Sequence, residues 1–180
     1  MDETLDICHL IKPDETMLDQ ISAYRATFLA VGDSMDGTGP LRRMENPEEW
    51  LAFNRLAEHH ETKPENWVPT EQFVYWRERD QAIVGAIQFR HEFNDFLRDF
   101  GGNIGYSIHP DERKKGYAKR MLQDCLAVCR AFGLEQVLIT CLVENEGSRR
   151  TILSCGGVYE KTVYCARDDV NLERYWIKLT

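Results

Sequence analysis

The chain has 180 residues, of which 43% are hydrophobic and 11% are aromatic. This length suits one hydrophobic core, so we expect residues 1–180 to form a single domain. The formal net charge of -8 argues against a general nucleic-acid binder, which needs Lys and Arg to neutralise phosphates. A neutral or cationic small partner is favoured instead.

Targeting and cysteine patterns narrow the class of protein further. No stretch approaches the roughly 20 apolar residues that span a bilayer, and MDETLDICHL lacks the basic start and apolar core of a secretory signal. We expect a cytoplasmic protein with no membrane partner. The six cysteines include no Cys-x-x-Cys pair, which indicates buried free thiols. Cys125 and Cys129 are four residues apart, but no further ligand completes a metal site.

The first 70 residues are expected to form a strand and two helices. Residues 5–11 alternate as a strand that Pro13 ends, and apolar spacing predicts a helix over residues 14–31. The segment GDSMDGTGP is typical of an exposed loop. A second helix is predicted to begin at Asn46 and Pro47, because Asn caps a helix and Pro suits its first turn.

The next segment changes to the two-residue period of strands. Residues 71–93 predict a hairpin that turns near residues 79–81. A short helical turn is expected at residues 94–102. Residues 103–110 then predict a strand that ends at Pro110.

An amphipathic helix is predicted from about Gly116 to Phe132, and Gly133 is placed to end it. Its inward-facing residues are expected to be Ala118, Met121, Leu122, Cys125, Leu126, Cys129 and Phe132.

The remaining residues predict a strand, a helix and then two further strands. Residues 136–143 are almost wholly apolar, as in a central strand covered on both faces. A helix is expected over residues 146–155, followed by strands at residues 158–166 and 172–179.

The segment HPDERKKGYAKRML, which begins at His109, places cationic side chains and a glycine before the long helix. The βαβ order predicts parallel strands with this loop at the carboxyl end of the sheet. Free amides and the helix dipole favour an anion there, and Gly116 lets a phosphate approach the backbone. A solvated basic loop is the alternative. The segment lacks both the Walker pattern and the three-glycine Rossmann fingerprint.

The same segment resembles the acetyl-CoA motif of the GCN5-related N-acetyltransferase (GNAT) superfamily, [QR]-x-x-G-x-[GA], at Arg113, Gly116 and Ala118. The resemblance is close over residues 70–165. It implies an α/β (α+β) GNAT fold, with a mixed central sheet of six or seven strands, splayed parallel central strands and about four helices. By this resemblance, a bacterial-type small acetyltransferase is expected.

The resemblance also implies how the domain is divided. Residues 1–70 would form the acceptor side, residues 70–165 the acetyl-CoA core, and residues 166–180 the C-terminal strand. Acetyl-CoA would lie where the strands ending near His109 and Val143 separate.

The resemblance further implies a set of cofactor-binding residues. The pantetheine arm would pair with the backbone of Ser107, Ile108 and His109. The pyrophosphate would bind the amides of Arg113, Lys114, Lys115, Gly116, Tyr117 and Ala118. Asn145 and Ser148 would contact the cofactor as well, although both residue types are also ordinary helix caps.

The implied reaction is direct acetyl transfer to an amine, with the Ile108 N–H stabilising the oxyanion. Two positions depart from the family: Asn103 and Ile152 stand where many members have Glu and Tyr. Neither residue moves a proton at neutral pH, so other groups or water must do so. The candidates for this role are Glu92, Glu144, Tyr164, His91, His109 and Tyr106. Cys141 is not favoured as a nucleophile, because no partner for it is evident.

Two functions follow from these expectations. The first is acetyl-CoA-dependent transfer to an unidentified amine of a small molecule, amino-acid derivative or peptide. The alternative is a CoA-binding sensor or interaction module without catalysis, which the departures at Asn103 and Ile152 keep open. A homodimer is also expected.

Overall fold

The computed structural model of the protein describes residues 5–180, which contain four α-helices and seven strands. They are β1 (Cys8–Ile11), α1 (Leu18–Val31), α2 (Pro47–Ala57), β2 (Thr70–Arg77), β3 (Ala82–Arg90), β4 (Ile104–Ile108), α3 (Tyr117–Phe132), β5 (Gln136–Leu142), α4 (Glu146–Ser154), β6 (Val158–Cys165) and β7 (Val170–Lys178). The expectation was six or seven strands and about four helices. A short helical turn at Leu97–Gly101 precedes β4, also as predicted.

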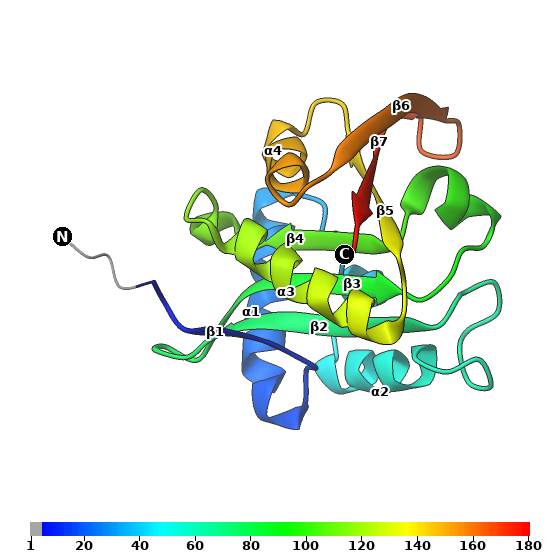
Figure 1. Ribbon diagram of the computed structural model, residues 1–180. Coiled ribbons are helices and arrows are strands. Elements are labelled where there is room, and N and C mark those ends of the chain that lie inside the picture. Colours follow the sequence, from blue (N-terminus) through cyan, green and yellow to red (C-terminus); the bar gives the residue numbers. More distant parts are fainter. Residues whose placement is uncertain (1–4) are drawn as a thin grey trace.

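The seven strands form two sheets, which Figure 1 shows side by side. The first has the order β1-β2-β3-β4 and the second the order β5-β7-β6. Every ladder within residues 5–180 is antiparallel. The structure therefore differs from the expected single mixed sheet: β4 and β5, the strands expected to be parallel neighbours, lie at the edges of two separate sheets and form no ladder with each other.

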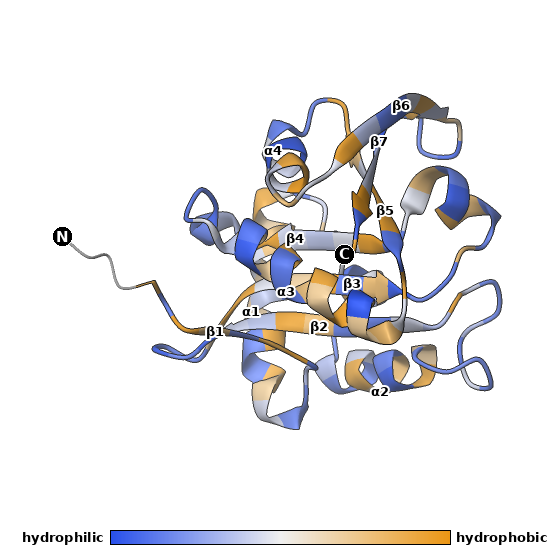
Figure 2. Cartoon of the chain, viewed as in Figure 1, coloured by the Kyte–Doolittle hydropathy of each residue, from blue (hydrophilic) through white to orange (hydrophobic). Residues whose placement is uncertain are grey.

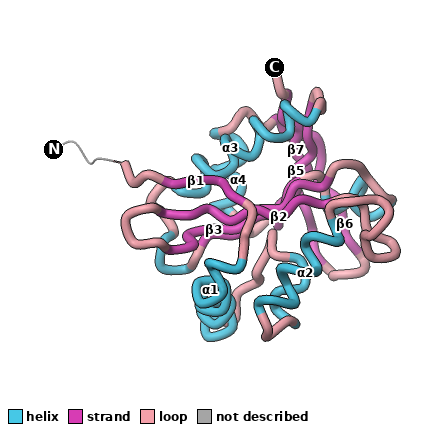
Figure 3. The backbone as a smooth tube through the Cα atoms, turned by 90° about the horizontal axis from the view of Figure 1, so that it is seen from below, coloured by secondary structure: helices cyan, strands magenta, loops and turns pink. Residues whose placement is uncertain are grey.

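The helices cover opposite faces of the first sheet. Seen from below, α1 and α2 lie on one side of the strands and α3 on the other (Figure 3), and α4 packs against α3 and β5. One apolar cluster joins α3 to strands of both sheets, and a second joins α1 and α2 to β2 and β3. This two-sided burial explains why β3 is a nearly continuous apolar run.

Helix ends form where their residue types predict. The Asn46 side chain accepts a hydrogen bond from the Glu48 N–H at 2.9 Å, and Pro47 opens α2. Gly133 ends α3 in the left-handed region with φ 114°. Apolar and polar residues alternate along α2 and α3 in Figure 2, in keeping with one buried face on each helix.

The prediction that Phe132 of α3 lies in the core is wrong. Phe132 is 51% exposed, whereas Met121, Leu122, Cys125 and Cys129 are fully buried. Phe132 lies in the last turn, where the helix passes the sheet edge, and its ring packs against the ring of His91 with a centroid distance of 4.3 Å.

A glycine permits the close approach of the two sheets. Gly102 has φ 67°, and a Cβ atom there would lie 2.4 Å from the carbonyl oxygen of Leu138 in β5. No side chain fits between these backbones without moving them.

We expect Gly102→Ala to lower the free energy of unfolding by more than 2 kcal/mol, since it adds a backbone clash to a strained φ (about 1 kcal/mol or more for each effect). Gly133→Ala is the matched control, because it has the same strained sign of φ but open space around its Cβ position. Urea denaturation of both variants measures the difference. Equal losses would contradict the argument from close approach.

Candidate functional site

The edge strands β4 and β5 meet at one end and separate toward the other. The Asn103 N–H donates to the Leu138 carbonyl at 2.8 Å, and the Leu138 N–H donates to Asn103 Oδ1 at 2.9 Å. No further backbone hydrogen bond joins β4 to β5 within the described chain. A gap therefore opens toward Ile108 and Leu142, where the two strands end.

The register of β4 decides which backbone groups face this gap. The His109 N–H donates to the Val84 carbonyl at 2.9 Å, so His109 is directed at β3. Directions alternate along an antiparallel strand, so the backbone of Ser107 also pairs with β3, and that of Tyr106 and Ile108 points to the gap. Among the three residues expected to pair with pantetheine, Ile108 has its N–H in that position.

The first turn of α3 presents unpaired amides beyond the end of β4. Gly116 has φ 85° and no side chain caps the helix, whose first backbone bond runs from the Arg120 N–H to the Gly116 carbonyl. The amides of Tyr117, Ala118 and Lys119 consequently have no acceptor in the helix. A Cβ atom at Gly116 would meet nothing within 4 Å, so the turn is open. Such a turn fits a phosphate group.

The cations of this loop are largely neutralised by neighbouring acids. Arg113 pairs with Asp33 at 2.7 Å, and Lys115 pairs with Glu112 at 3.0 Å. Lys114, by contrast, has no salt bridge to residues 5–180. The loop's backbone amides are thus the more consistent anion-binding feature.

Tyr117 is buried, and its side chain anchors the loop. Its hydroxyl group hydrogen-bonds with Asp6 and with Arg77, the latter at 2.9 Å. Arg77 is itself buried and donates to both Glu112 and Asp80. Arg77, followed by Lys115, lowers the pKa of the Glu112 carboxyl group to about 2. This cluster joins the end of β2 to the start of α3.

A tyrosine spans the gap to the start of α4. The Tyr106 hydroxyl lies 2.8 Å from Ser148 Oγ, and the Ser148 N–H donates to Asn145 Oδ1 at 3.1 Å. Burial raises the pKa of Tyr106 to about 12, so its hydroxyl group is protonated at neutral pH. Tyr106 and Ser148 were each considered from sequence, but nothing in the sequence indicates that they touch.

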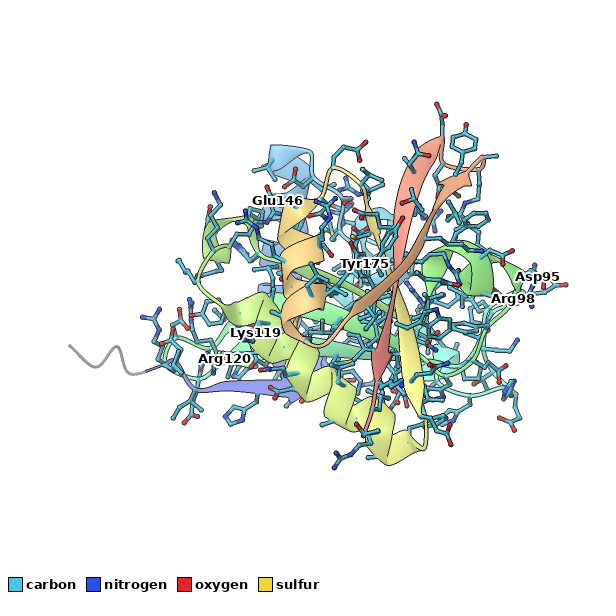
Figure 4. All side chains as sticks on the ribbon, turned by 45° about the horizontal axis from the view of Figure 1, so that its top comes forward. Asp95, Arg98, Lys119, Arg120, Glu146 and Tyr175 are labelled. Atoms are coloured by element: carbon cyan, nitrogen blue, oxygen red, sulfur yellow. The ribbon has the colours of Figure 1, made fainter. Side chains whose placement is uncertain are left out.

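The starts of α3 and α4 lie on one side of the molecule. Figure 4 places Lys119, Arg120 and Glu146 there, away from Asp95 and Arg98 at the opposite end. The gap, the open turn of α3 and the Tyr106–Ser148 pair therefore form one candidate site.

Three of the proton-transfer candidates lie away from this site. Glu92 follows the end of β3 that pairs with the start of β4, at the closed end of the gap. His91 lies beside it and pairs with Glu71 at 2.8 Å. Tyr164 is on β6, which β7 separates from β5, and donates to Asp169 at 2.6 Å.

Two further candidates lie nearer to the gap. Glu144 is exposed just beyond β5, and its side chain forms no salt bridge with residues 5–180. His109 follows β4, and its Nδ1 accepts a hydrogen bond from the Asp111 N–H at 3.2 Å. Cys141 is buried in β5, and burial raises its pKa to about 11, which keeps it a thiol.

The two positions that depart from the family have structural roles. Asn103 is buried and uses its side chain both to accept from the Leu138 N–H and to donate to the Arg90 carbonyl at 3.2 Å. A carboxylate could not make both bonds, since it only accepts. Ile152 is fully buried in the core beneath α4.

The described residues form neither a membrane-spanning helix nor a metal-binding cluster. Within residues 5–180, no helix is both long and apolar enough to cross a bilayer. The same residues contain no group of three or more His, Cys, Asp or Glu side chains that could share a metal ion.

Comparison with known proteins identifies one matching family and solved structures that share the fold. Residues 18–158 match the model of the acetyltransferase (GNAT) domain. No curated protein sequence is significantly similar to the chain. Solved structures with the same fold are 14–18% identical to it.

Three of these structures are acetyltransferases that match nearly whole chains. RimL, a ribosomal L7/L12 α-N-protein acetyltransferase solved with coenzyme A, has a TM-score of 0.70 at 14% identity over 97% of this chain and 95% of its own. The ribosomal-protein-S5-alanine acetyltransferase from Vibrio fischeri has a TM-score of 0.68 at 18% identity, over 95% and 91%. A chimera of the spermidine N-acetyltransferase SpeG from Vibrio cholerae and hSSAT has a TM-score of 0.63 at 16% identity, over 96% and 95%.

We expect Glu112→Gln to lower the free energy of unfolding by about 2 kcal/mol at pH 7, because it takes one carboxylate from buried Arg77. The folded pKa of Glu112 is depressed below its ordinary value of 4.5, so its contribution is complete above that pH and is lost as the pH falls toward 2. Urea denaturation at pH 7, 5 and 3 should show the two proteins converging below pH 4.5.

Glu78→Gln serves as the control, since Glu78 forms only an exposed pair with His9. A difference between wild type and Glu112→Gln that stays constant down to pH 3 would contradict the role given to Glu112.

Proposed function

The chain belongs to the GNAT acetyltransferase family, and we propose that it transfers an acetyl group from acetyl-CoA directly to the primary amine of a small molecule, amino-acid derivative or peptide. The observation that carries this proposal is the open, uncapped turn at Gly116 beside a gap faced by the Ile108 N–H. The uncapped turn suits a diphosphate, and the N–H that faces the gap suits the carbonyl group of a thioester. The structural neighbours named for spermidine and for ribosomal proteins act on amines as well.

Residues of this chain suit the binding of the cofactor. The amides of residues 116–119 would hold the diphosphate, and Lys114 would add a charge at the rim. The edge of β4 would pair with the pantetheine arm through Tyr106 and Ile108. Asn145 and Ser148 lie on the opposite side of the gap, at the start of α4. Acetyl-CoA supplies the activated acetyl thioester.

For acetyl transfer, residues of the chain must stabilise the developing negative charge and move protons. The Ile108 N–H would donate to the oxygen on which negative charge develops. Tyr106 carries a proton at neutral pH and contacts Ser148, so the pair can donate a proton to the leaving sulfur. Glu144, exposed beyond β5, would accept the proton of the incoming amine through water.

A CoA-binding protein without catalysis is the second candidate. It is favoured by the structural use of Asn103 and Ile152, which leaves the family's usual Glu and Tyr positions without proton chemistry. Thiol release from acetyl-CoA with a panel of primary amines separates the two. Release above the no-amine rate supports transfer, whereas CoA binding without release supports the second candidate. The cytoplasmic location and the homodimer both stay predictions. Size-exclusion chromatography would test the homodimer.

We expect Gly116→Glu to weaken CoA binding at least tenfold, because a carboxylate would project from the turn that holds the diphosphate. Gly133→Glu is the matched control: it adds the same charge at the other end of α3, at a glycine that also has positive φ and open space. Calorimetric titration with CoA measures both. Equal affinities of the two variants would count against the assigned site.

We expect Tyr106→Phe to lower kcat about 10- to 100-fold while leaving the Kd for CoA within about twofold, because a general acid acts mainly on the chemical step. Tyr164→Phe is the control, since Tyr164 lies on β6 away from the gap. Steady-state rates of thiol release and CoA titrations give the two quantities. An unchanged kcat in Tyr106→Phe would show that Tyr106 is not the general acid.

A further inference from the structure

On the sheet face opposite α3, an arginine of β3 has no acid partner among residues 5–180. Arg90 ends β3, and its Nη1 donates to the carbonyl groups of Gly101 at 3.0 Å and Gly102 at 3.4 Å. Its Nε and Nη2 donate to no atom of residues 5–180, and no carboxylate of those residues forms a salt bridge with it. Although burial lowers the pKa of Arg90 to about 10, the guanidinium remains charged at neutral pH.

A glycine makes room for this guanidinium over β4. Gly105 pairs with Gln88 in the register of β3 and β4, so it lies on the sheet face that looks away from α3. A Cβ atom at Gly105 would be 2.8 Å from Arg90 Nη2. The Arg90 side chain therefore crosses from β3 onto the strand that borders the gap.

The loop after α1 brings an opposite charge to the same face. Gly37 packs directly on β4, where its Cβ position lies 2.4 Å from the Gly105 carbonyl oxygen. The neighbouring residue is Asp36, whose Oδ2 accepts a hydrogen bond from Ser34 Oγ at 3.2 Å. Partial burial raises the pKa of the Asp36 carboxyl group, although the Ser34 hydrogen bond opposes this shift. Asp36 is therefore one residue from the point where this loop meets β4 beside Arg90, and it forms no salt bridge with Arg90.

We propose that this face binds an acceptor that carries its own carboxylate, as an amino acid does, with Arg90 donating to the carboxylate and Asp36 attracting the ammonium group. The inference rests on the proposed acetyl transfer and specifies its acceptor. The free Nε and Nη2 form the planar edge that binds a carboxylate with two parallel hydrogen bonds. A single guanidinium beside Asp36 favours a monoanion over a phosphate dianion.

A second arginine, Arg174, has a structural role and serves as a comparison for Arg90. Arg174 of β7 also fastens the turn at Leu97–Gly101, because its Nη1 donates to the carbonyl groups of Arg98 at 2.6 Å and Asp99 at 2.9 Å. Its Nε, however, donates to Glu160 at 2.8 Å. The charge of Arg174 is therefore balanced by Glu160, whereas Arg90 forms no salt bridge with residues 5–180.

The test compares kcat/KM for α-amino acids with that for their carboxamides, which keep the amine and lose the charge. Wild type should prefer the acids, and Arg90→Gln should lower kcat/KM for the acids about 10- to 100-fold, while changing that for the amides less than about threefold. Arg174→Gln should affect acids and amides in parallel. Asp36→Asn should weaken both substrates, because both keep the amine.

A binding measurement keeps the inference separate from catalysis. In saturating CoA, N-acetylglycine should raise the Tm of wild type more than N-acetylglycinamide does, and Arg90→Gln should lose this difference. If no amine is acetylated while this difference is present, acetyl transfer fails and the carboxylate site stands. If neither assay distinguishes acid from amide, or if Arg174→Gln loses the preference as Arg90→Gln does, the inference is overturned.

Discussion

The two-way hydrogen bond between Asn103 and the backbone of Leu138 is the constraint on which the site depends. It fastens the two sheets at one point, and Gly102 allows the backbones to come that close. Because the strands are joined there and nowhere else in the described chain, they diverge toward their carboxyl ends. The Ile108 N–H is left without a partner among residues 5–180, whereas the Ile108 carbonyl accepts a hydrogen bond from Arg113 Nε at 3.3 Å. Unpaired edge groups are what an extended ligand needs to add itself to a sheet. The gap therefore follows from the geometry of the junction.

The junction also divides the molecule into two chemical environments. On the side of α3 and α4 lie the uncapped amides and the Tyr106–Ser148 pair. On the side of α1 lie Arg90 and Asp36, over a strand that glycine leaves bare. A net charge of -8 hides this local arrangement, in which Arg90 packs over Gly105 of β4 and forms no salt bridge with residues 5–180. Overall charge is thus a poor guide to the acceptor, and the local pairing of charges is a better one.

Local sequence predicted elements better than it predicted the site. Asn46–Pro47 and Gly133 act through their own backbones and neighbours, so the bounds of α2 and α3 could be predicted. The burial of Phe132 depended on where α3 leaves the sheet, which no local pattern encodes. The backbone directions of residues 107–109 depend on register, and a shift by one residue would exchange them. The Tyr106–Ser148 contact joins residues 42 positions apart, which only the tertiary fold brings together.

The cluster around Arg77 has a consequence for how the turn at the start of α3 meets its ligand. Glu112, Lys115 and Tyr117 are all tied to the protein through this cluster, and Arg120 donates to the Asp6 carbonyl. The turn is thereby held in its left-handed shape before any anion arrives. Ordering a free loop costs on the order of 1–2 kcal/mol per residue in conformational entropy. A loop ordered in advance leaves that free energy available as affinity, so even a few amide bonds are enough to retain a diphosphate.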